Sequence, residues 1–388
     1  MPTAPTILSG PAGSFAWSVF HERHPKLTQQ VLDALPYGPT ERAAVGRLLF
    51  ESTSGVLEPL AEQAHDSGQW LEWGRGLWGL PWSEAPFLWA ESYFYRRLLE
   101  ATGYFRPGAW QGIDPFAPFK DAELAGRAVD DELAALGDLS SLSAEKRAEA
   151  LLLSALWGNR ADLSFQITAA AGEAPSHALI ADDSPLLWST LAAAGNPRVC
   201  LIADNAGREL LPDLVLVDHL LTSGSAAEVV LYVKPHPYYV SDATTADVLA
   251  TLDRLRAAPG QEAERIGRRL WQAMGTGTLT VRTHEFFCAP LPFHDLPADL
   301  RTELSAATLT ILKGDLNYRR LVGDQFWDAT TPFAERADHF PSPVAALRTL
   351  KSDVVVGLTG PVVAALNATG KPWRTSGTHA LIQVHPGA

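Results

Sequence analysis

Hydrophobic residues in the first third of the chain recur at the spacing of helices. In HPKLTQQVLDAL, for example, Leu27, Val31 and Leu35 lie on one helical face. ERAAVGRLLF and VLEPLAEQAH have the same character, and Ser143 is a suitable N-cap for a helix over SAEKRAEALLLSALW. Residues 70–119 hold half of the twelve tryptophans, whose large apolar areas are suited to burial. The pattern predicts a helical layer with an aromatic core.

From about Ala178 the pattern changes to short runs that are apolar throughout. These runs are ALIAD, RVCLIAD, EVVLYVK, LTILKGD and DVVVGL, and polar turns and helical stretches follow them. Runs without alternation suit strands that are covered on both faces, which predicts a largely parallel sheet built from strand and helix units. We therefore expect an α/β fold in which the helical part and the sheet part share one large interface.

Length and charge narrow the function classes. The chain has 388 residues, of which 46% are hydrophobic, and a formal net charge of -13, which argues against general attraction to nucleic acid or to an anionic membrane. It lacks a recognisable secretion signal, and no apolar run approaches the ~20 residues of a bilayer span, so we expect a cytoplasmic protein. The only cysteines, Cys200 and Cys288, are expected in the core. Nothing indicates an obligate protein partner.

Polar residues follow several of the predicted strands, where the carboxyl ends of parallel strands meet at one edge of a sheet. Carboxylate and amide oxygens suit Mg²⁺ or Mn²⁺, and lysines and arginines on an otherwise acidic protein suit a phosphate. A metal-assisted phosphoryl reaction uses both sets. His236, between two prolines, is more typical of a fixed turn than of a base. The strand-end residues are Asp204, Asn205, Lys234, His236, Asp242, Lys313, Asp315, Asn317, Arg319, Arg348 and Lys351.

Other catalytic signatures are weak or missing. GRGLWG, from Gly74 to Gly79, matches the dinucleotide fingerprint in its letters, but no predicted strand leads into it. The phosphate loop that ends in Lys-Ser/Thr is missing, as are a nucleophile elbow around a serine and a paired-histidine zinc helix. These features argue against P-loop kinases, serine hydrolases and zinc proteases.

Long motifs give a more specific indication. LWGNRADLS, ADNAGREL, VKPHPYYVSDA, KGDLNYRRLVGD and RTLKSDVVVGL, in this order, resemble the damage-control phosphatases. The resemblance is to the sugar-phosphate subfamily with an Arg-Thr-x-Lys motif, also named acidic-residue methyltransferase-like proteins. SFAWSVFHERHPKL and APFLWAESYFYRRL are similar to the helical domain of that subfamily. The resemblance extends from about Ser14 to Val384.

The resemblance implies a helical N-terminal domain, residues 1–150, on a Rossmann-like α/β/α sandwich with a mostly parallel sheet, residues 151–388. It also implies one divalent metal, Mn²⁺, Mg²⁺, Co²⁺ or Ni²⁺, held by Asp204, Asn205 and Asp242. Relatives are described as hydrolysing sugar phosphates such as fructose 1-phosphate and fructose 6-phosphate. The implied substrate-binding residues are Asp204, Asn205, Glu209, Asp315, Leu316, Asn317, Tyr318, Arg319 and Lys351. Arg208 departs from the hydrophobic residue expected at its position.

The leading hypothesis is a metal-dependent phosphatase of small sugar phosphates in metabolite damage control, with Asp204, Asp242 and Lys351 as catalytic residues. Lys351, together with Lys313 or Arg319, would neutralise the phosphate. Water or an aspartate could attack, and we favour metal-activated water.

Further residues are candidates for the rim of this site. Asn159, Arg160 and Asp162 are either sugar contacts or helix-end structure, and Glu91 and Arg96 are candidates for closing the site from the helical part. The alternative functions are an S-adenosylmethionine-dependent protein carboxyl (glutamate) methyltransferase, in which Glu209 would contact the cofactor, and a non-catalytic sugar-phosphate sensor.

Overall fold

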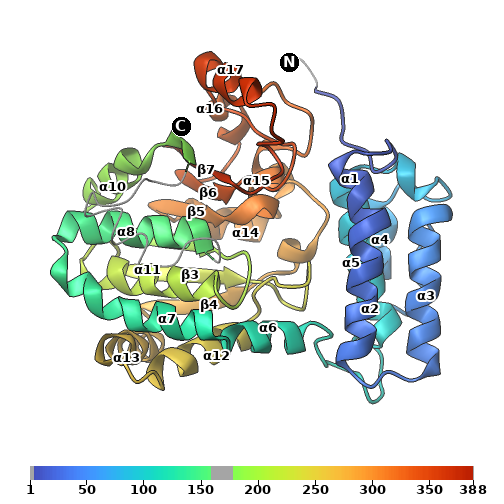
Figure 1. Ribbon diagram of the computed structural model, residues 1–388, viewed down its shortest axis with the longest axis horizontal. Coiled ribbons are helices and arrows are strands. Elements are labelled where there is room, and N and C mark those ends of the chain that lie inside the picture. The colour runs from blue at the N-terminus through green and yellow to red at the C-terminus, as the bar shows by residue number, and fades with distance from the viewer. Residues whose placement is uncertain (1–3, 159–177, 388) are drawn as a thin grey trace.

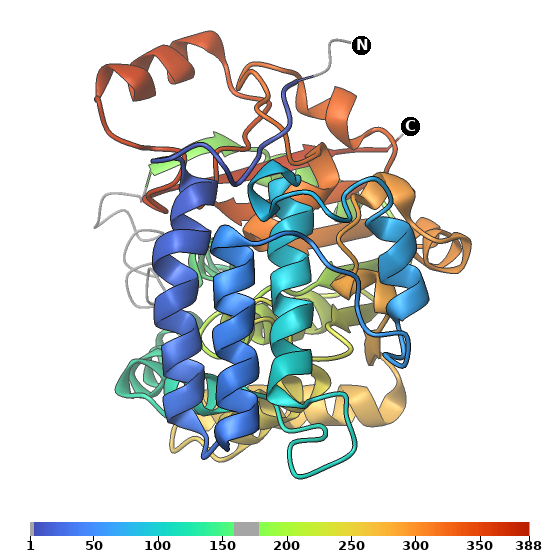
Figure 2. The ribbon, with the colours of Figure 1, turned by 90° about the vertical axis from the view of Figure 1, so that its right-hand side faces the viewer.

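A computed structural model of the chain describes residues 4–158 and 178–387 (Figure 1). Its first part is a layer of helices, and Figure 2 looks onto this layer, in which the long helices run side by side. The elements of the layer are α1 (Phe15–Ser18), η1 (Val19–Arg23), α2 (His24–Ala34), α3 (Pro39–Ser54), α4 (Ser67–Trp73), η2 (Trp82–Glu84) and α5 (Phe87–Thr102).

Helix α5 is buried on nearly all sides, because it lies between the other helices and the sheet part. Tyr93 of α5 is in ring contact with Trp70, Trp82 and Trp89, at centroid distances between 5.0 and 5.7 Å. Two of these contacts are tilted and one, with Trp82, is stacked, and aromatic pairs of this kind bury large apolar areas. The tryptophan-rich stretch therefore forms the core of the helical layer, as its composition predicts.

The second part contains one seven-stranded sheet. Its strands lie in the order β1-β7-β6-β5-β2-β3-β4, and all neighbours are parallel except β6 and β7. Strands β1 and β7 consequently run opposite to the other five. The strands are β1 (Ala178–Asp182), β2 (Arg198–Ile202), β3 (Glu228–Val233), β4 (Leu279–Thr283), β5 (Leu309–Lys313), β6 (Val344–Thr349) and β7 (His379–His385). The predicted α/β class with a mostly parallel sheet is confirmed.

Helices cover both faces of the sheet, so that residues of one strand enter two cores. Leu201 packs in one core and Ile202, the next residue of β2, in the other. The face with Leu201 is covered by α7 (Arg127–Ala135), η3 (Leu136–Ser141), α8 (Ala144–Trp157), α10 (Ser184–Ala192), α11 (Leu210–Thr222), α12 (Thr245–Arg256) and α13 (Gln261–Thr276). The other face meets the helical layer, η5 (Glu285–Cys288), η6 (Phe293–Asp295), α14 (Ala298–Ser305), α15 (Gly314–Val322), α16 (Phe333–Ala337) and α17 (Gly360–Ala368). Helix α6 (Ala117–Leu124) leads from the layer to α7.

Helix α8 begins and ends as its sequence predicts. The Ser143 side chain accepts a hydrogen bond from the Lys146 backbone N–H, and Gly158 forms the C-cap. This helix packs on α11 and β6, so the boundary expected at residue 150 falls inside a helix of the sheet part. The division into two domains at that residue stays a prediction. Among the described residues, no helix combines the length and hydropathy that a membrane span requires.

The strand predicted in DVVVGL is wrong. Residues 353–358 form no strand, and the strand of this region is β6, immediately before them. Val354 and Val356 are fully buried, yet side chains satisfy their backbone groups: Arg348 donates to the Val354 carbonyl, Gln383 donates to the Val356 carbonyl, and the Val356 N–H donates to the Tyr318 hydroxyl. An apolar run can thus be buried without a strand ladder when side chains pair with its backbone.

Three further points differ from the sequence prediction. VLEPLAEQAH is not helical, because the Leu57 backbone pairs with residues 79 and 80 and Pro59 disfavours a helix interior. The strands in LTVRT and HALIQVH, β4 and β7, were not predicted. ALIAD is a strand, but it runs opposite to β2, so its carboxyl end lies at the other edge of the sheet.

A buried arginine joins the helical layer to the sheet part. Arg319 of α15 forms ion pairs with Glu91 of α5 at 3.2 Å and with Asp324 at 2.7 Å. Each of the three side chains is exposed by less than a tenth. Asp324 also accepts a hydrogen bond from the backbone N–H of Leu88, close to the start of α5. The charges of two layers therefore compensate each other inside the interface.

We expect Arg319→Met to lower the free energy of unfolding by about 3–5 kcal/mol, because the change leaves two buried carboxylates without their shared cation. Arg75→Met is the matched control, since Arg75 pairs with Glu72 at the surface and such pairs contribute about 0–1 kcal/mol. Urea unfolding of both variants measures the difference. Equal losses in the two variants would show that the buried pair does not stabilise the interface.

His24 gives a second prediction for stability. Its ring stacks on Phe94 at 3.7 Å between centroids, and neither ring nitrogen has a hydrogen-bond partner among the described residues. Burial, assisted by the Arg23 charge, holds the pKa of His24 well below its ordinary value. Below about pH 6.5 the unfolded chain takes up a proton that the folded chain does not, so stability falls as pH decreases, by up to about 1.4 kcal/mol per pH unit.

His24→Phe should remove this part of the pH dependence. As the pH falls from 7 to 5, the free energy of unfolding of the variant is expected to increase relative to that of the natural chain. The reason is that phenylalanine takes up no proton in the unfolded state. Denaturant unfolding at the two pH values checks the difference. The idea fails if the difference in stability between the two chains is the same at both.

Candidate active site

A small cavity lies where the strand order of the sheet reverses. From β2 the chain continues to β3 and β4 on one side and then returns to β5 and β6 on the other. In open α/β sheets, ligands bind outside the carboxyl ends of the strands at such a point. The cavity has a volume of about 180 Å³. It is lined by Phe15, Arg23, Glu91, Asp204, Asn205, Tyr239, Ser241, Asp242, Asp315, Leu316, Arg319 and Lys351.

Backbone hydrogen bonds bring the two expected metal-binding segments together. The Asp204 carbonyl, just after β2, accepts a hydrogen bond from Ala243 N–H at 2.8 Å, and Asn205 and Asp242 form an antiparallel bridge. The Ser241 hydroxyl donates to Asn205 Oδ1 at 2.7 Å. The end of one strand and the loop after its neighbour are therefore held in a fixed register.

The loop that carries Asp242 has a strained backbone. Tyr239 and Val240 have φ angles of 44° and 70°, and the second is unusual for a β-branched residue. The helical layer holds this loop, because the Tyr239 ring lies 4.7 Å from the ring of Tyr95 and its hydroxyl is 3.1 Å from the Ser92 hydroxyl. Strain of this kind persists only where surrounding contacts determine the conformation, which is common at functional sites.

Burial raises the pKa of the carboxyl groups of Asp204 and Asp242. For Asp204 the pKa rises well above its ordinary value because of burial and the negative charges of Glu209 and Asp242. For Asp242 burial raises the pKa to about 6, although Lys234, 3.2 Å away, opposes the rise. The excess of buried negative charge and the oxygen-only donors Asp204, Asn205 and Asp242 fit a divalent cation such as Mg²⁺ or Mn²⁺.

The donor set contains two carboxylates and one amide. No group of three or more histidine, cysteine, aspartate and glutamate side chains within reach of one metal occurs in the described ranges 4–158 and 178–387. Asn205 supplies the third oxygen in the expected set, so this finding does not conflict with the expectation. The assignment of the metal ligands stays a prediction.

Lys351 enters the cavity from the segment after β6. Its Nζ is 3.4 Å from Glu209 Oε1, while Glu209 Oε2 accepts a hydrogen bond from Asn205 at 3.0 Å. Asp315 lies beside it and pairs with Arg348 at 2.7 Å. Burial alone would raise the pKa of Asp315, but Arg348 and Arg319 outweigh it and lower the pKa. Asp315 is therefore kept as a carboxylate next to a lysine.

Several strand-end residues lie outside the cavity. Lys313 is buried in a pair with Asp213 at 2.5 Å, so it does not neutralise a ligand in this cavity. Asn317 donates to the Lys313 carbonyl at 2.8 Å and to the carbonyl of Ala203, while Tyr318 donates to Gln383 at 2.9 Å. Asn317 thus supports the ends of β2 and β5, while Tyr318 binds a residue of β7. The contact of either residue with substrate stays a prediction.

Of the candidate rim residues, some line the cavity and others do not. Glu91 lines the cavity, whereas Arg96 pairs with Asp66 at 2.6 Å and does not. His236 contacts its own turn through the Pro237 carbonyl, as expected for a turn residue. Arg208 lies beside Glu123 and is not part of the lining. Asn159, Arg160 and Asp162 lie outside the described residues.

Four lining residues were not identified from the sequence as site residues: Phe15, Arg23, Tyr239 and Ser241. Tyr239 and Ser241 lie within the motif that carries Asp242, so proximity in the sequence gave a signal. Phe15 and Arg23 lie in a motif that resembles the family's helical domain, but the helical pattern alone does not show that it meets the strand ends. Only the packing of the two layers places them there.

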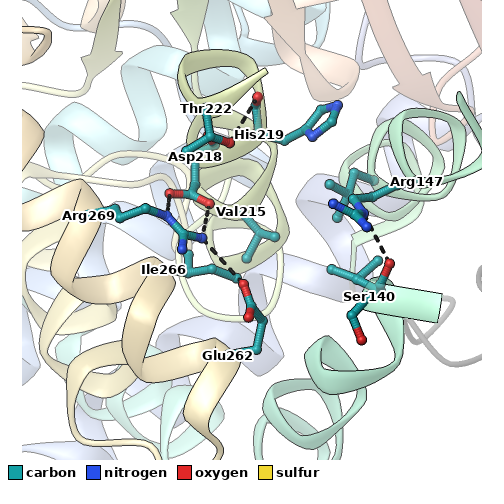
Figure 3. Close-up of a pocket in the computed structure, with 11 residues that line it drawn as sticks. Ser140, Arg147, Val215, Asp218, His219, Thr222, Glu262, Ile266 and Arg269 are labelled. Carbon is teal, nitrogen blue, oxygen red and sulfur yellow. Dashed lines mark hydrogen bonds and ion pairs between the residues drawn. The ribbon is translucent and has the colours of Figure 1, made fainter. Parts of the chain in front are cut away.

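A second cavity, of about 120 Å³, lies among η3, α8, α11 and α13 (Figure 3). Its charged groups are already paired: Arg269 binds both carboxylate oxygens of Asp218, at 2.8 and 2.6 Å, and also contacts Glu262. Arg147 donates to the Leu139 carbonyl at 3.0 Å. The strand-end residues line the first cavity instead, so we take that cavity as the candidate active site.

Comparisons with known proteins agree with the sequence motifs. Residues 19–366 match the family model described as "Damage-control phosphatase ARMT1-like domain". Proteins named "Damage-control phosphatase ARMT1" from Danio rerio, Mus musculus and Homo sapiens are 31%, 30% and 29% identical to this chain. The matches cover 96%, 99% and 99% of this chain and 94%, 99% and 99% of the relatives.

A crystal structure of a DUF89 family protein from Pyrococcus horikoshii has a similar fold. Its TM-score is 0.50 at 16% identity, over 94% of this chain and 96% of the other. At this identity the likeness supports the fold alone. The resemblance that the motifs indicate is confirmed by the family model and by the relatives of nearly equal length. The chain therefore belongs to the ARMT1-like damage-control phosphatase family.

Proposed function

We propose that this chain is a divalent metal-dependent phosphatase of small sugar phosphates such as fructose 1-phosphate or fructose 6-phosphate. Membership of the family implies a hydrolase of the damage-control phosphatase type. The metal requirement and the substrate class go beyond that membership. In this proposal the protein works in the cytoplasm, and its partner is the small-molecule substrate.

One observation carries the proposal: Asp204, Asn205, Asp242 and Lys351 line the same small cavity at the reversal of the strand order. A cavity of about 180 Å³ is below the roughly 300–1,000 Å³ of pockets for drug-sized ligands and so suits a small metabolite. Oxygen donors for a cation and an amine for an anion are the two parts that a phosphate monoester requires.

The chain's own residues divide the work between binding and proton transfer. A bound divalent ion would neutralise phosphate oxygens and lower the pKa of water. Lys351 donates hydrogen bonds to a phosphate oxygen, and its pairing with Glu209 orients the amine before substrate binds. Asp204 or Asp242 accepts the proton of the attacking water. Asp315, fixed by Arg348, holds the segment of Lys351 through the Lys351 backbone N–H at 3.3 Å.

The geometry favours this reading over the methyltransferase alternative. Glu209, the residue that would contact S-adenosylmethionine, binds Asn205 and Lys351 with its two carboxylate oxygens. Its position thus serves the predicted metal and phosphate sites. A non-catalytic sensor would not need a proton acceptor beside the cation site, and turnover with saturating metal separates it from an enzyme.

Hydrolysis of fructose 1-phosphate or fructose 6-phosphate should require Mn²⁺, Mg²⁺, Co²⁺ or Ni²⁺ and should stop in excess chelator. Asp204→Ala is expected to lower kcat about a hundredfold or more, because it removes a carboxylate of the predicted metal site. Release of inorganic phosphate measures both effects.

Asp182→Ala is the matched control for this experiment. Asp182 is also a strand-end aspartate, but it is exposed, and β1 carries it to the other edge of the sheet. Its activity should stay within about twofold of the natural chain, as for most surface changes. Full turnover in excess chelator would overturn the proposal.

Gly314 offers a test of how the position of Asp204 matters. Gly314 has a φ of +83°, and a Cβ at this residue would lie 1.8 Å from Asp204 Oδ2. Gly314→Ala should therefore displace the carboxylate and reduce kcat/KM about a hundredfold, the loss that a shift of about 1 Å can cause. Steady-state kinetics measures this loss.

Gly277→Ala separates displacement from backbone strain. Gly277 has nearly the same φ, +81°, but a Cβ there meets no atom within 4 Å. Both variants should lose about 1–2 kcal/mol of stability from the left-handed backbone. Only Gly314→Ala should lose activity, and equal activities in the two variants would show that Asp204 does not depend on this contact.

A further inference from the structure

The cavity has one wall that comes from the helical layer. Arg23 lies at the end of η1, and Glu91 lies on α5; both line the cavity with the strand-end residues. Glu91 is buried, while Arg23 is exposed. The Arg23 charge acts on Glu91 and partly opposes the rise in its pKa that burial and Asp324 cause. The two side chains are therefore electrostatic neighbours, although they form no ion pair within 4 Å.

The cations around the cavity differ in how they are engaged. Lys351 pairs with Glu209, Arg348 with Asp315, Lys234 with Asp242, and Arg319 with Glu91 and Asp324, at 2.7 to 3.4 Å. Arg23 lines the same cavity, but its side chain has no hydrogen bond or ion pair to any other described residue. Its five N–H donors are thus available to a bound molecule.

The chemistry of this wall is complementary to hydroxyl groups. A guanidinium only donates hydrogen bonds and a carboxylate only accepts them, whereas a hydroxyl group does both. An arginine next to a glutamate can therefore bind adjacent hydroxyls of a sugar. A second phosphate or carboxylate on the substrate would meet the negative charge of Glu91 at the same place.

The two parts of the chain thus contribute different groups to the cavity. Lys351 and the predicted metal ligands, which suit a phosphate, come from the sheet part, and Arg23 and Glu91 come from the helical layer. We propose that Arg23 and Glu91 form the subsite for the sugar hydroxyls and that Arg23 determines the preference for sugar phosphates over other phosphate monoesters. This inference rests on the proposed phosphatase function and names the residues that select its substrate class.

The test compares Arg23→Gln on two substrates in the presence of the activating metal. For fructose 1-phosphate, kcat/KM should fall about ten- to a hundredfold, mostly through KM, as expected for a lost charged hydrogen bond in substrate binding. For p-nitrophenyl phosphate, which has no hydroxyl groups, the fall should be about twofold at most. The inhibition constant of inorganic phosphate, measured with p-nitrophenyl phosphate as substrate, should also change by about twofold at most.

Two other variants make the comparison sharper. Arg47→Gln is the matched control, because Arg47 is an exposed arginine of α3 in the same helical layer and does not line the cavity. It should hydrolyse both substrates like the natural chain. Arg23→Lys keeps the charge but loses the planar fork, so it should recover only part of the activity on fructose 1-phosphate. Thermal unfolding of the three variants verifies that the fold is retained.

The possible results separate the two proposals. Suppose that the natural chain hydrolyses sugar phosphates and that Arg23→Gln lowers kcat/KM by the same factor for both substrates. Arg23 then acts on the phosphate, and the proposed hydroxyl subsite is refuted. Unchanged activity of Arg23→Gln on fructose 1-phosphate would also overturn the subsite while the phosphatase function stands. If the natural chain hydrolyses no sugar phosphate with any of the four metals, the proposed function fails, and the subsite fails with it.

Discussion

The buried guanidinium of Arg319 is the interaction on which the architecture of the site depends. It is placed between Glu91 of the helical layer and Asp324 of the sheet part, with almost no exposure to solvent. A buried charge is tolerated only when it is paired and hydrogen-bonded, so the two layers must stay in contact for the three groups to be stable. The Arg319 side chain also lies over the ring of Phe87, which adds an apolar contact to the same interface.

This interface explains why the cavity has walls from distant parts of the sequence. Once α5 is fixed against α15, Tyr95 and Ser92 of α5 reach the loop that carries Asp242 and hold Tyr239 in its strained conformation. The sheet supplies the position of the chemistry, because the ends of β2 and β5 are neighbours at the reversal of the strand order. The helical layer supplies the remaining wall and the support of the loop. The arrangement of the site is thus a property of the interface as much as of the sheet.

Ion pairs inside the protein determine which cations a ligand can reach. The lysines and arginines that follow the strands are almost all used inside the protein: Lys313 stabilises Asp213 in the core, and Arg348 stabilises Asp315 and the buried segment after β6. A lysine after a strand is therefore not by itself evidence of a ligand contact. What distinguishes Lys351 is that it lines the cavity and its side chain is about 35% exposed, so a ligand can reach its amine.

The elements with strong local signals can be predicted from the sequence. Uninterrupted apolar runs gave β2, β3 and β5, Ser143 and Gly158 marked the ends of α8, and the order of the strands' polar ends indicated a metal and phosphate chemistry. These signals are local, because a strand covered on both faces must be apolar throughout and a helix end needs a partner for its free backbone groups. The motifs also sufficed to indicate the family.

Which polar residues line the cavity depends on contacts between elements that are far apart in the sequence. Residues 353–358 look like a strand but have their backbone groups bound by Arg348, Tyr318 and Gln383, three side chains that no local pattern brings together. In the same way, Lys313 and Arg319 are both cations after one strand, yet one is enclosed in the core and the other lines the cavity. The physical reason is that burial and pairing depend on neighbours from other elements, which the spacing of residues along the chain does not specify.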